Sequence, residues 1–147
     1  MKKTVLLFVF DGFADWQTSY ATAGIKESDV YQVKTIALEK EPVTTLSGMC
    51  VLPDLDFRPE VDLADLDNTN TAMIILPGGD LSVYENKAVQ LLVKHCLIHF
   101  VHVASMVTTN DITPIEFANA IFDVLNIERN EIVYNETPYF ESMVSAQ

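Results

Sequence analysis

This sequence has few positively charged side chains: Lys and Arg number 9 against 21 Asp and Glu in 147 residues, for a formal net charge of -12. Binding to nucleic acid or to an anionic membrane surface needs a basic face, so the composition predicts neither partner. No apolar run reaches the roughly 18 residues that a membrane-spanning helix needs. Hydrophobic residues make up 49% of the chain, which indicates one folded domain over residues 1–147 rather than disorder.

Cysteine is scarce too. Cys50 and Cys96 provide neither a disulfide framework nor a metal-ligand spacing, so we expect free thiols, a cytoplasmic protein and no metal or cofactor. Cys96 falls on the apolar stripe of a predicted helix and is expected to be buried, whereas Cys50 is expected to be packed or a stray surface thiol. His95, His99 and His102 follow at helix-like intervals, but the predicted helix ends before His102 and no carboxylate lies in that stretch. A solvated or strand-end role is therefore favoured over a metal site.

Hydrophobic periodicity predicts strands that alternate with helices. Strands are predicted over residues 4–10, 31–38 and 71–76. The first follows a basic start, as in a signal peptide, but it is interpreted as a strand because it ends at Asp11-Gly12 without a small-residue cleavage site. Residues 44–51 straddle Ser47-Gly48 and predict a small hairpin or bent strand. Residues 53–70 are acidic and irregular, which favours a solvated surface connection.

Three helices are predicted, the first from Asp15 to near Gly24, the second over residues 86–100 and the third from a capping box at Thr113–Glu116 to Asn126. Their inner stripes are Trp16, Tyr20 and Ala23 in the first, Val89, Leu92, Val93, Cys96 and Phe100 in the second, and Ala118, Ile121, Phe122 and Leu125 in the third. Residues 128–147 predict one more helix with a loose terminus. This alternation indicates a mostly parallel sheet with helices on both sides.

One stretch does not fit this plan. Residues 101–104 read as a strand and residues 106–109 read as another, yet a crossover between parallel neighbours takes a dozen or more residues. Essentially no residues lie between Ala104 and Ser105. The pattern therefore predicts either one long strand or a missing piece of chain at this point, and periodicity alone does not choose between them.

Three motifs, taken in order, resemble the ThiJ/PfpI family of the class I glutamine-amidotransferase-like superfamily. They are Asp11-Gly12-Phe13-Ala14-Asp15-Trp16-Gln17 after the first strand, Ile74-Ile75-Leu76-Pro77-Gly78-Gly79-Asp80, and Val107-Thr108-Thr109-Asn110 leading into Pro114-Ile115-Glu116-Phe117-Ala118. The resemblance covers almost the whole chain and implies a flavodoxin-like three-layer sandwich, which would be incomplete here. It also implies a homodimer that acts on a small-molecule or peptide substrate if it is active.

The family's chemistry rests on a cysteine at a nucleophile elbow, a glutamate that hydrogen-bonds it, and a glycine turn that offers amides to an oxyanion. By resemblance, Gly78 and Gly79 match the glycine turn, with a plain tight turn as the equally favoured alternative. Gln17 falls at the glutamate position, where an amide keeps the size but loses the carboxylate. After His102-Val103-Ala104 the family continues with an apolar residue, a cysteine and a small residue. This sequence continues instead with Ser105-Met106-Val107, which resembles the start of the family's C-terminal strand.

Three hypotheses follow. The first is a cysteine hydrolase or amidotransferase-like enzyme whose nucleophile segment, on the order of 50 residues, is missing between Ala104 and Ser105. The second is a degenerate, non-catalytic binding or chaperone-like module, which Gln17 favours. The third is an unrelated flavodoxin-like binding domain, which is weak because no phosphate-binding loop follows the first strand. The first is the favoured prediction, since a deletion through the middle of a sandwich should leave its core exposed.

Overall fold

The computed structural model describes residues 2–57, 66–106 and 112–128. Its strands are β1 (Lys3–Phe8), β2 (Tyr31–Ala37), β3 (Val43–Thr44), β4 (Cys50–Val51), β5 (Leu55–Asp56), β6 (Thr71–Leu76) and β7 (His102–Ser105). Its helices are α1 (Asp15–Glu27), the 3₁₀ helix η2 (Leu81–Glu85), α2 (Lys87–Ile98) and α3 (Pro114–Leu125). These elements alternate in the way that the hydrophobic pattern predicts.

Five of the strands form one parallel sheet in the order β5-β2-β1-β6-β7. The two continuously apolar strands, β1 and β6, lie side by side at its centre, since only central strands are covered on both faces. The other two strands, β3 and β4, form a small antiparallel hairpin outside this sheet, as predicted for residues 44–51. The architecture is the predicted mostly parallel α/β sandwich.

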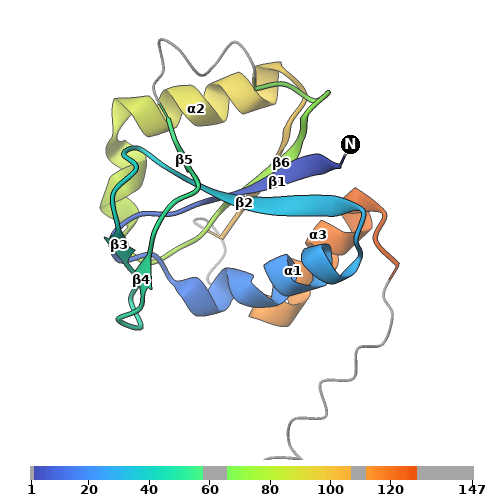
Figure 1. The fold of residues 1–147 in the computed structure, drawn as a ribbon, viewed down its shortest axis with the longest axis horizontal. Coiled ribbons are helices and arrows are strands. Elements are labelled where there is room, and N and C mark those ends of the chain that lie inside the picture. The colour runs from blue at the N-terminus through green and yellow to red at the C-terminus, as the bar shows by residue number, and fades with distance from the viewer. Residues whose placement is uncertain (1, 58–65, 107–111, 129–147) are drawn as a thin grey trace, which may run out of the picture.

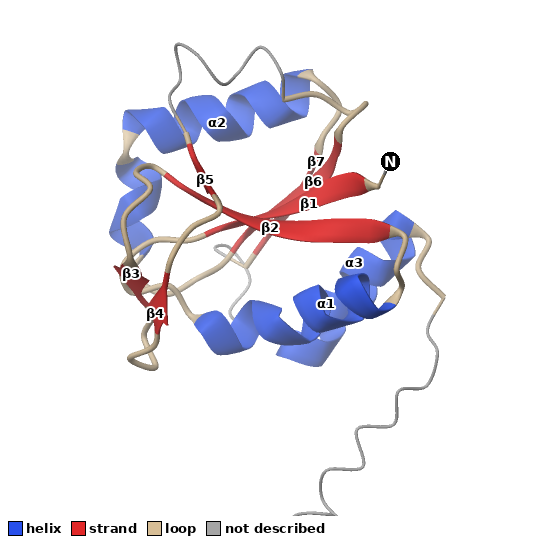
Figure 2. Cartoon of the chain, in the orientation of Figure 1, coloured by secondary structure: helices blue, strands red, loops and turns tan. Residues whose placement is uncertain are grey.

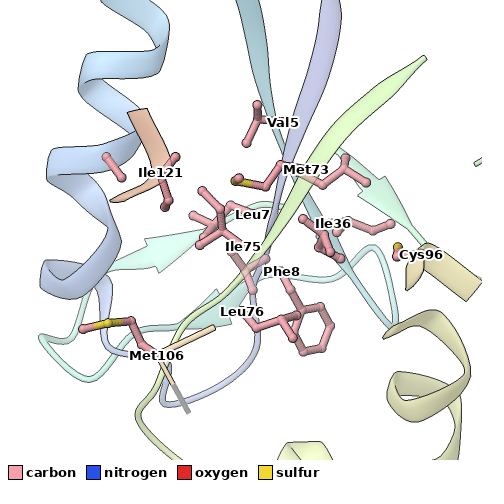
Figure 3. Packing of buried hydrophobic residues seen from close by; sticks show 14 of the residues in the cluster. Val5, Leu7, Phe8, Ile36, Met73, Ile75, Leu76, Cys96, Met106 and Ile121 are labelled. Carbon is pink, nitrogen blue, oxygen red and sulfur yellow. The ribbon is translucent and has the colours of Figure 1, made fainter. Parts of the chain in front are cut away.

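Helices cover both faces of the sheet. Helices α1 and α3 lie together on one face and α2 lies on the other (Figures 1 and 2). Because side chains alternate along a strand, β6 divides its residues between two cores: Ile75 packs toward α1 and α3, and Leu76 packs toward α2. Figure 3 shows members of both cores, with Met106 on the α1 side of the sheet and Cys96, a residue of α2, on the other side. Cys96 is fully buried, as predicted.

The helix ends follow local hydrogen bonding. Asn86 caps α2 by accepting from Ala88 N–H at 2.8 Å, and Thr113 Oγ1 caps α3 by accepting from Glu116 N–H at 3.1 Å, which confirms the capping signal. Helix α3 ends at Asn126, which adopts the left-handed conformation with φ of 56°. Its predicted stripe is buried against α1, so the two helices form one layer.

The prediction for α1 was wrong about its inner face. Its buried residues are Thr18, Ala21 and Ile25, whereas Trp16 is 53% exposed, so the inner face is rotated from the predicted stripe. The helix also runs past Gly24 to Glu27. A Cβ at Gly24 would lie 2.8 Å from Phe122 Cε1. The glycine therefore serves close packing of α1 on α3 rather than ending the helix.

The acidic connection differs from expectation, and at the predicted break the chain runs on within one strand. Residues 53–70 contain β5, a two-residue strand that pairs with β2, because a short strand needs only a paired edge and not an apolar run. Ala104 and Ser105 are consecutive residues of β7 and pair with Ile75 and Leu76. Met106 continues in that direction by donating its N–H to Leu76 O at 3.0 Å. The remaining residues of the predicted strand, 107–109, and the predicted tail helix after residue 128 lie outside the described residues.

Candidate functional site

Three loops meet at the carboxyl-terminal edge of the sheet, where ligands bind in open α/β folds. The loop after β1 and the loop after β6 form an antiparallel bridge between Phe13 and Gly79. This bridge is flanked by Ala14 N–H to Gly78 O at 2.9 Å and Asp80 N–H to Gly12 O at 3.0 Å. The β3–β4 hairpin joins them, since Leu46 N–H donates to Phe13 O at 3.0 Å. The first two resemblance motifs are thereby brought into contact.

Gly79 holds the tightest point of this junction. Its φ is +115°, in the region that side chains rarely adopt. A Cβ at this position would fall well inside contact distance of Gly12 O and 2.8 Å from Ala14 N. Backbone approach and backbone conformation therefore both require glycine here, whatever chemistry the turn performs.

Gln17 contacts the same turn from the first turn of α1. Its side-chain oxygen, Oε1, accepts from Gly78 N–H at 2.8 Å, and the side chain is half-buried. A Cβ on Gly78 would lie 2.8 Å from that oxygen, so the absence of a side chain at 78 lets the amide reach the backbone. The structure thus brings together all three predicted site residues, Gln17, Gly78 and Gly79.

This contact limits what the turn can offer a ligand. The N–H of Gly78 is already used by Gln17, and the bridge uses Gly78 O and Asp80 N. Within the part of the chain that the structure describes, Gly79 N–H has no hydrogen-bond partner. It is therefore the amide at this turn that can donate to an incoming carbonyl oxygen or carboxylate without displacing a protein group.

A second group of polar residues borders the turn. The Ser47 hydroxyl donates to Asp15 Oδ2, and Ser47 Oγ lies 3.0 Å from Thr45 Oγ1. The Ser47 hydrogen bond is the largest cause that lowers the pKa of Asp15. A carboxylate held in its charged form beside a hydroxyl is an anchor for the hairpin loop, and it is a poor proton acceptor at neutral pH.

Tyr84 supports the turn from the other side. Its hydroxyl donates to Pro77 O, and its ring packs edge-on against Phe10 with 5.6 Å between ring centroids. Burial raises the pKa of Tyr84, so the hydroxyl stays protonated and keeps donating. The turn is therefore fixed by Gln17 on one side and by Tyr84 on the other.

The thiols lie elsewhere. Cys96 is buried in α2, where burial raises the pKa of its thiol to about 12, and Cys50 is exposed on β4. Counted from Ala104, the position where the resemblance implies the cysteine is occupied by Met106, which is 5% exposed. Among the described residues, no group of three or more His, Cys, Asp or Glu side chains is placed to hold a metal ion.

The histidines of α2 take a structural arrangement. His95 and His99 stack with ring centroids 3.9 Å apart. His95 Nε2 lies 2.8 Å from Leu66 O, and His99 Nδ1 lies 2.9 Å from His95 O. The contact with Leu66 fastens the chain that precedes β6 to the helix, and the contact of His99 with His95 is local to the end of α2. His102 is exposed at the start of β7, as expected for a strand-end residue.

Comparison with known proteins agrees with this geometry. The model of the DJ-1/PfpI family matches residues 3–113, which include both loop motifs and the bridge between them. The chain belongs to the DJ-1/PfpI family. The resemblance drawn from the motifs is therefore confirmed, and so is the fold class.

Individual relatives match with low identity or over part of their length. The uncharacterized protease YoaZ of Bacillus subtilis (strain 168) is 32% identical over 85 residues, which are 53% of this chain and 38% of that protein. The DJ-1 superfamily protein Atu0886 from Agrobacterium tumefaciens has 18% identity and a TM-score of 0.67, with 96% of this chain and 98% of that chain covered. The ThiJ/PfpI domain protein from Brachyspira murdochii has 15% identity and the same TM-score, with 86% and 98% covered. At these identities the two structures establish the fold alone.

The structure adds residues to the DJ-1/PfpI-type site that the sequence pattern did not indicate. Asp15 and Ser47 were not predicted to pair, although both lie within stretches that we singled out. The sequence did not indicate a role for Tyr84, because an aromatic residue after a glycine turn is as readily explained by core packing. In the described chain, no helix is long and apolar enough to cross a membrane.

Proposed function

We propose that this chain is a non-catalytic member of the DJ-1/PfpI family, a binding module built on the scaffold of a cysteine hydrolase. The observation that carries the proposal is Met106. Strand β7 runs through Ala104 and Ser105 without a break, so we place Met106 at the family's cysteine position rather than in the C-terminal strand that Ser105-Met106-Val107 also resembles. Its thioether has no proton to lose and is a poor nucleophile. Met106 is buried in the hydrophobic core on the α1 side of the sheet, where it acts as a packing residue (Figure 3).

Gln17 supports the same conclusion. A glutamate at this place could hold a proton or share one with a thiol, whereas the amide of Gln17 is neutral at all relevant pH values. It accepts from Gly78 N–H and so occupies one of the two amides of the turn. The crevice then has one free donor, Gly79 N–H. One donor is enough to bind the carbonyl of a small molecule or peptide, but an oxyanion is stabilised by more than one.

The test measures turnover of model substrates. A fluorogenic peptide-amide library and p-nitrophenyl acetate are incubated with the protein and with its Cys50→Ser variant. We expect no turnover above buffer for either protein, because Cys96 is buried and Cys50 is exposed in the short strand β4 rather than at a turn from a strand into a helix. Hydrolysis by the protein that disappears in Cys50→Ser would overturn the proposal, since it would show a working thiol.

A second candidate is a cysteine-dependent hydrolase whose nucleophile segment belongs between Ala104 and Ser105. The observation that favours it is the name of the relative YoaZ, which is called a protease, together with the retained glycine turn. The decisive measurement is the intact mass of the protein from its natural source. A mass near 16.4 kDa supports the non-catalytic module, and a mass several kilodaltons higher supports the hydrolase.

We further propose that the protein is a cytoplasmic homodimer. Three large apolar side chains support self-association: Trp16, Leu46 and Met49 are 53%, 53% and 62% exposed on the first turn of α1 and on the hairpin loop. Sedimentation equilibrium tests this. We expect a dimer that becomes monomeric in Trp16→Lys, and a monomer at all concentrations would contradict the proposal.

A further inference from the structure

A groove of about 390 Å³ lies between helix α2 and the ends of β6 and β7, and Tyr84 is among its lining residues. Its floor is apolar and comes from Leu76, Val89 and Val93, and its rim carries Leu97, which is 61% exposed. Leu91 and Ile98 on the same helix are 48% and 59% exposed. An apolar surface of this kind beside a concavity is typical of a binding site.

One wall of the groove is the edge of the sheet. In the described residues β7 pairs with β6 on one side and with no strand on the other. Met106 N–H points to β6, since it donates to Leu76 O. Backbone groups alternate along a strand, so the N–H of Val103 points away from the sheet and is available to an added strand.

The stretch of sequence that forms α2 and β7 differs in charge from the rest of the chain. Residues 87–105 contain two lysines, three histidines and no Asp or Glu, although the chain as a whole carries 21 acidic residues. Lys94 is the charged residue that lines the groove, and it is exposed. Within the described structure its ammonium forms no ion pair. A carboxylate placed in the groove would therefore meet a free cation.

We infer that this groove binds an extended peptide of a partner protein. The peptide adds as a strand to the free edge of β7, places alternate apolar side chains between β7 and α2, and sets a carboxylate against Lys94. Strand addition supplies affinity through main-chain hydrogen bonds, while the pockets for alternate side chains select the sequence. The groove shares Tyr84 with the support of the glycine turn. The inferred peptide contacts involve Val103 and Lys94, which take no part in that turn, so this inference holds whether or not the protein is a hydrolase.

A foreign peptide fits the groove better than a second copy of the chain does. The homodimer proposed above forms through Trp16, Leu46 and Met49 on α1 and the hairpin loop, and α1 lies on the face of the sheet opposite to α2 (Figure 1). A second copy bound there leaves the groove beside α2 uncovered, and a short peptide can place a carboxylate against Lys94. At physiological salt, screening restricts the electrostatic attraction on the peptide to charges within about 8 Å of it. Among the described residues that line the groove, Lys94 alone is charged, although Glu85 adjoins the lining residue Tyr84.

Fluorescence polarisation with the full chain tests the inference. The probe is the fluorescein-labelled heptapeptide Thr-Val-Thr-Val-Thr-Val-Asp. The control probe is the same peptide with Lys-amide in place of the last Asp. We expect saturable binding of the Asp peptide and about tenfold weaker binding of the Lys-amide peptide, which loses a charge-assisted contact. Lys94→Glu should weaken the Asp peptide by a similar factor. Lys40→Glu makes the same change of charge at an exposed site elsewhere, and it should have no effect.

Two variants at position 103 test the strand addition. Val103→Pro removes the outward N–H at an edge position that tolerates proline and should abolish binding, whereas Val103→Thr keeps the N–H and should retain it. Circular dichroism and thermal unfolding verify that each variant folds. Three results would each refute the inference: no binding by the wild-type chain, equal binding by Val103→Pro and Val103→Thr, or self-association of the chain that Lys94→Glu removes. The last would assign the groove to a second copy.

Discussion

Replacing Gly79 by alanine should be the most damaging methyl addition at the candidate site. The side chain would be forced to φ of +115°, a strain of roughly 1–3 kcal/mol. It would also push apart the bridge with Phe13, with its hydrogen bonds at 2.9 and 3.0 Å, each worth about 0.5–1.5 kcal/mol. We expect Gly79→Ala to lower the free energy of unfolding by about 2–6 kcal/mol in urea titrations.

Gly48 provides the matched control. Its φ is +88°, but a Cβ there would meet nothing within 4 Å, so Gly48→Ala costs only the backbone strain of about 1–2 kcal/mol. For a domain of this size each kcal/mol shifts the melting temperature by roughly 2–4 °C. If the two variants lose the same stability, the close approach of the loops after β1 and β6 is wrong, and the geometry of the site is wrong with it.

Three further predictions concern packing, reactivity and pH. Gly24→Ala should destabilise the protein by about 1–3 kcal/mol, although alanine is the better helix former, because its methyl meets a ring of α3; a gain in melting temperature would contradict that contact. Because burial raises the pKa of Cys96 to about 12, a thiol reagent at roughly pH 8 should label Cys50 alone until urea unfolds the chain, and mass spectrometry of the labelled peptides checks this. The Ser47 hydroxyl lowers the pKa of Asp15, so its stabilising effect is present at neutral pH and is lost as pH falls through the folded-state pKa. The stability difference from Ser47→Ala should therefore shrink in acid, and a constant difference from neutral pH down to about pH 3 would refute it.

The sequence predicted the elements whose local signals agree with their packing. Short apolar runs such as those of β1 and β6 indicate strands that are buried on both faces. Thr113 and Asn126 mark the two ends of α3, the first by its side-chain hydrogen bond and the second by its left-handed backbone. Where tertiary packing decides, the pattern failed. The role of Gly24 in packing was not predicted, because nothing local shows that Phe122 lies against it.

The candidate site was predicted only by its motifs. The proximity of Gln17 to the glycine turn follows from parallel strands that end at one edge, and the structure confirms the contact. Which atom of the amide meets which N–H does not follow from a pattern, nor does the pairing of Asp15 with Ser47 across 32 positions. Such contacts depend on the hairpin's path over the sheet edge, which no local signal determines.

The pairing of α1 with α3 in one layer has a consequence for synthesis of the chain. The Tyr31 hydroxyl at the start of β2 donates to Leu125 O at the end of α3, 94 positions later. At 5–20 residues per second the ribosome needs roughly 5–19 seconds to make that stretch. During this interval Ala21 and Ile25 have no partner helix, and the nascent chain exposes an apolar face. Contacts so distant in sequence also slow folding, so this family member should depend on a chaperone or on rapid release more than a helical bundle of equal length.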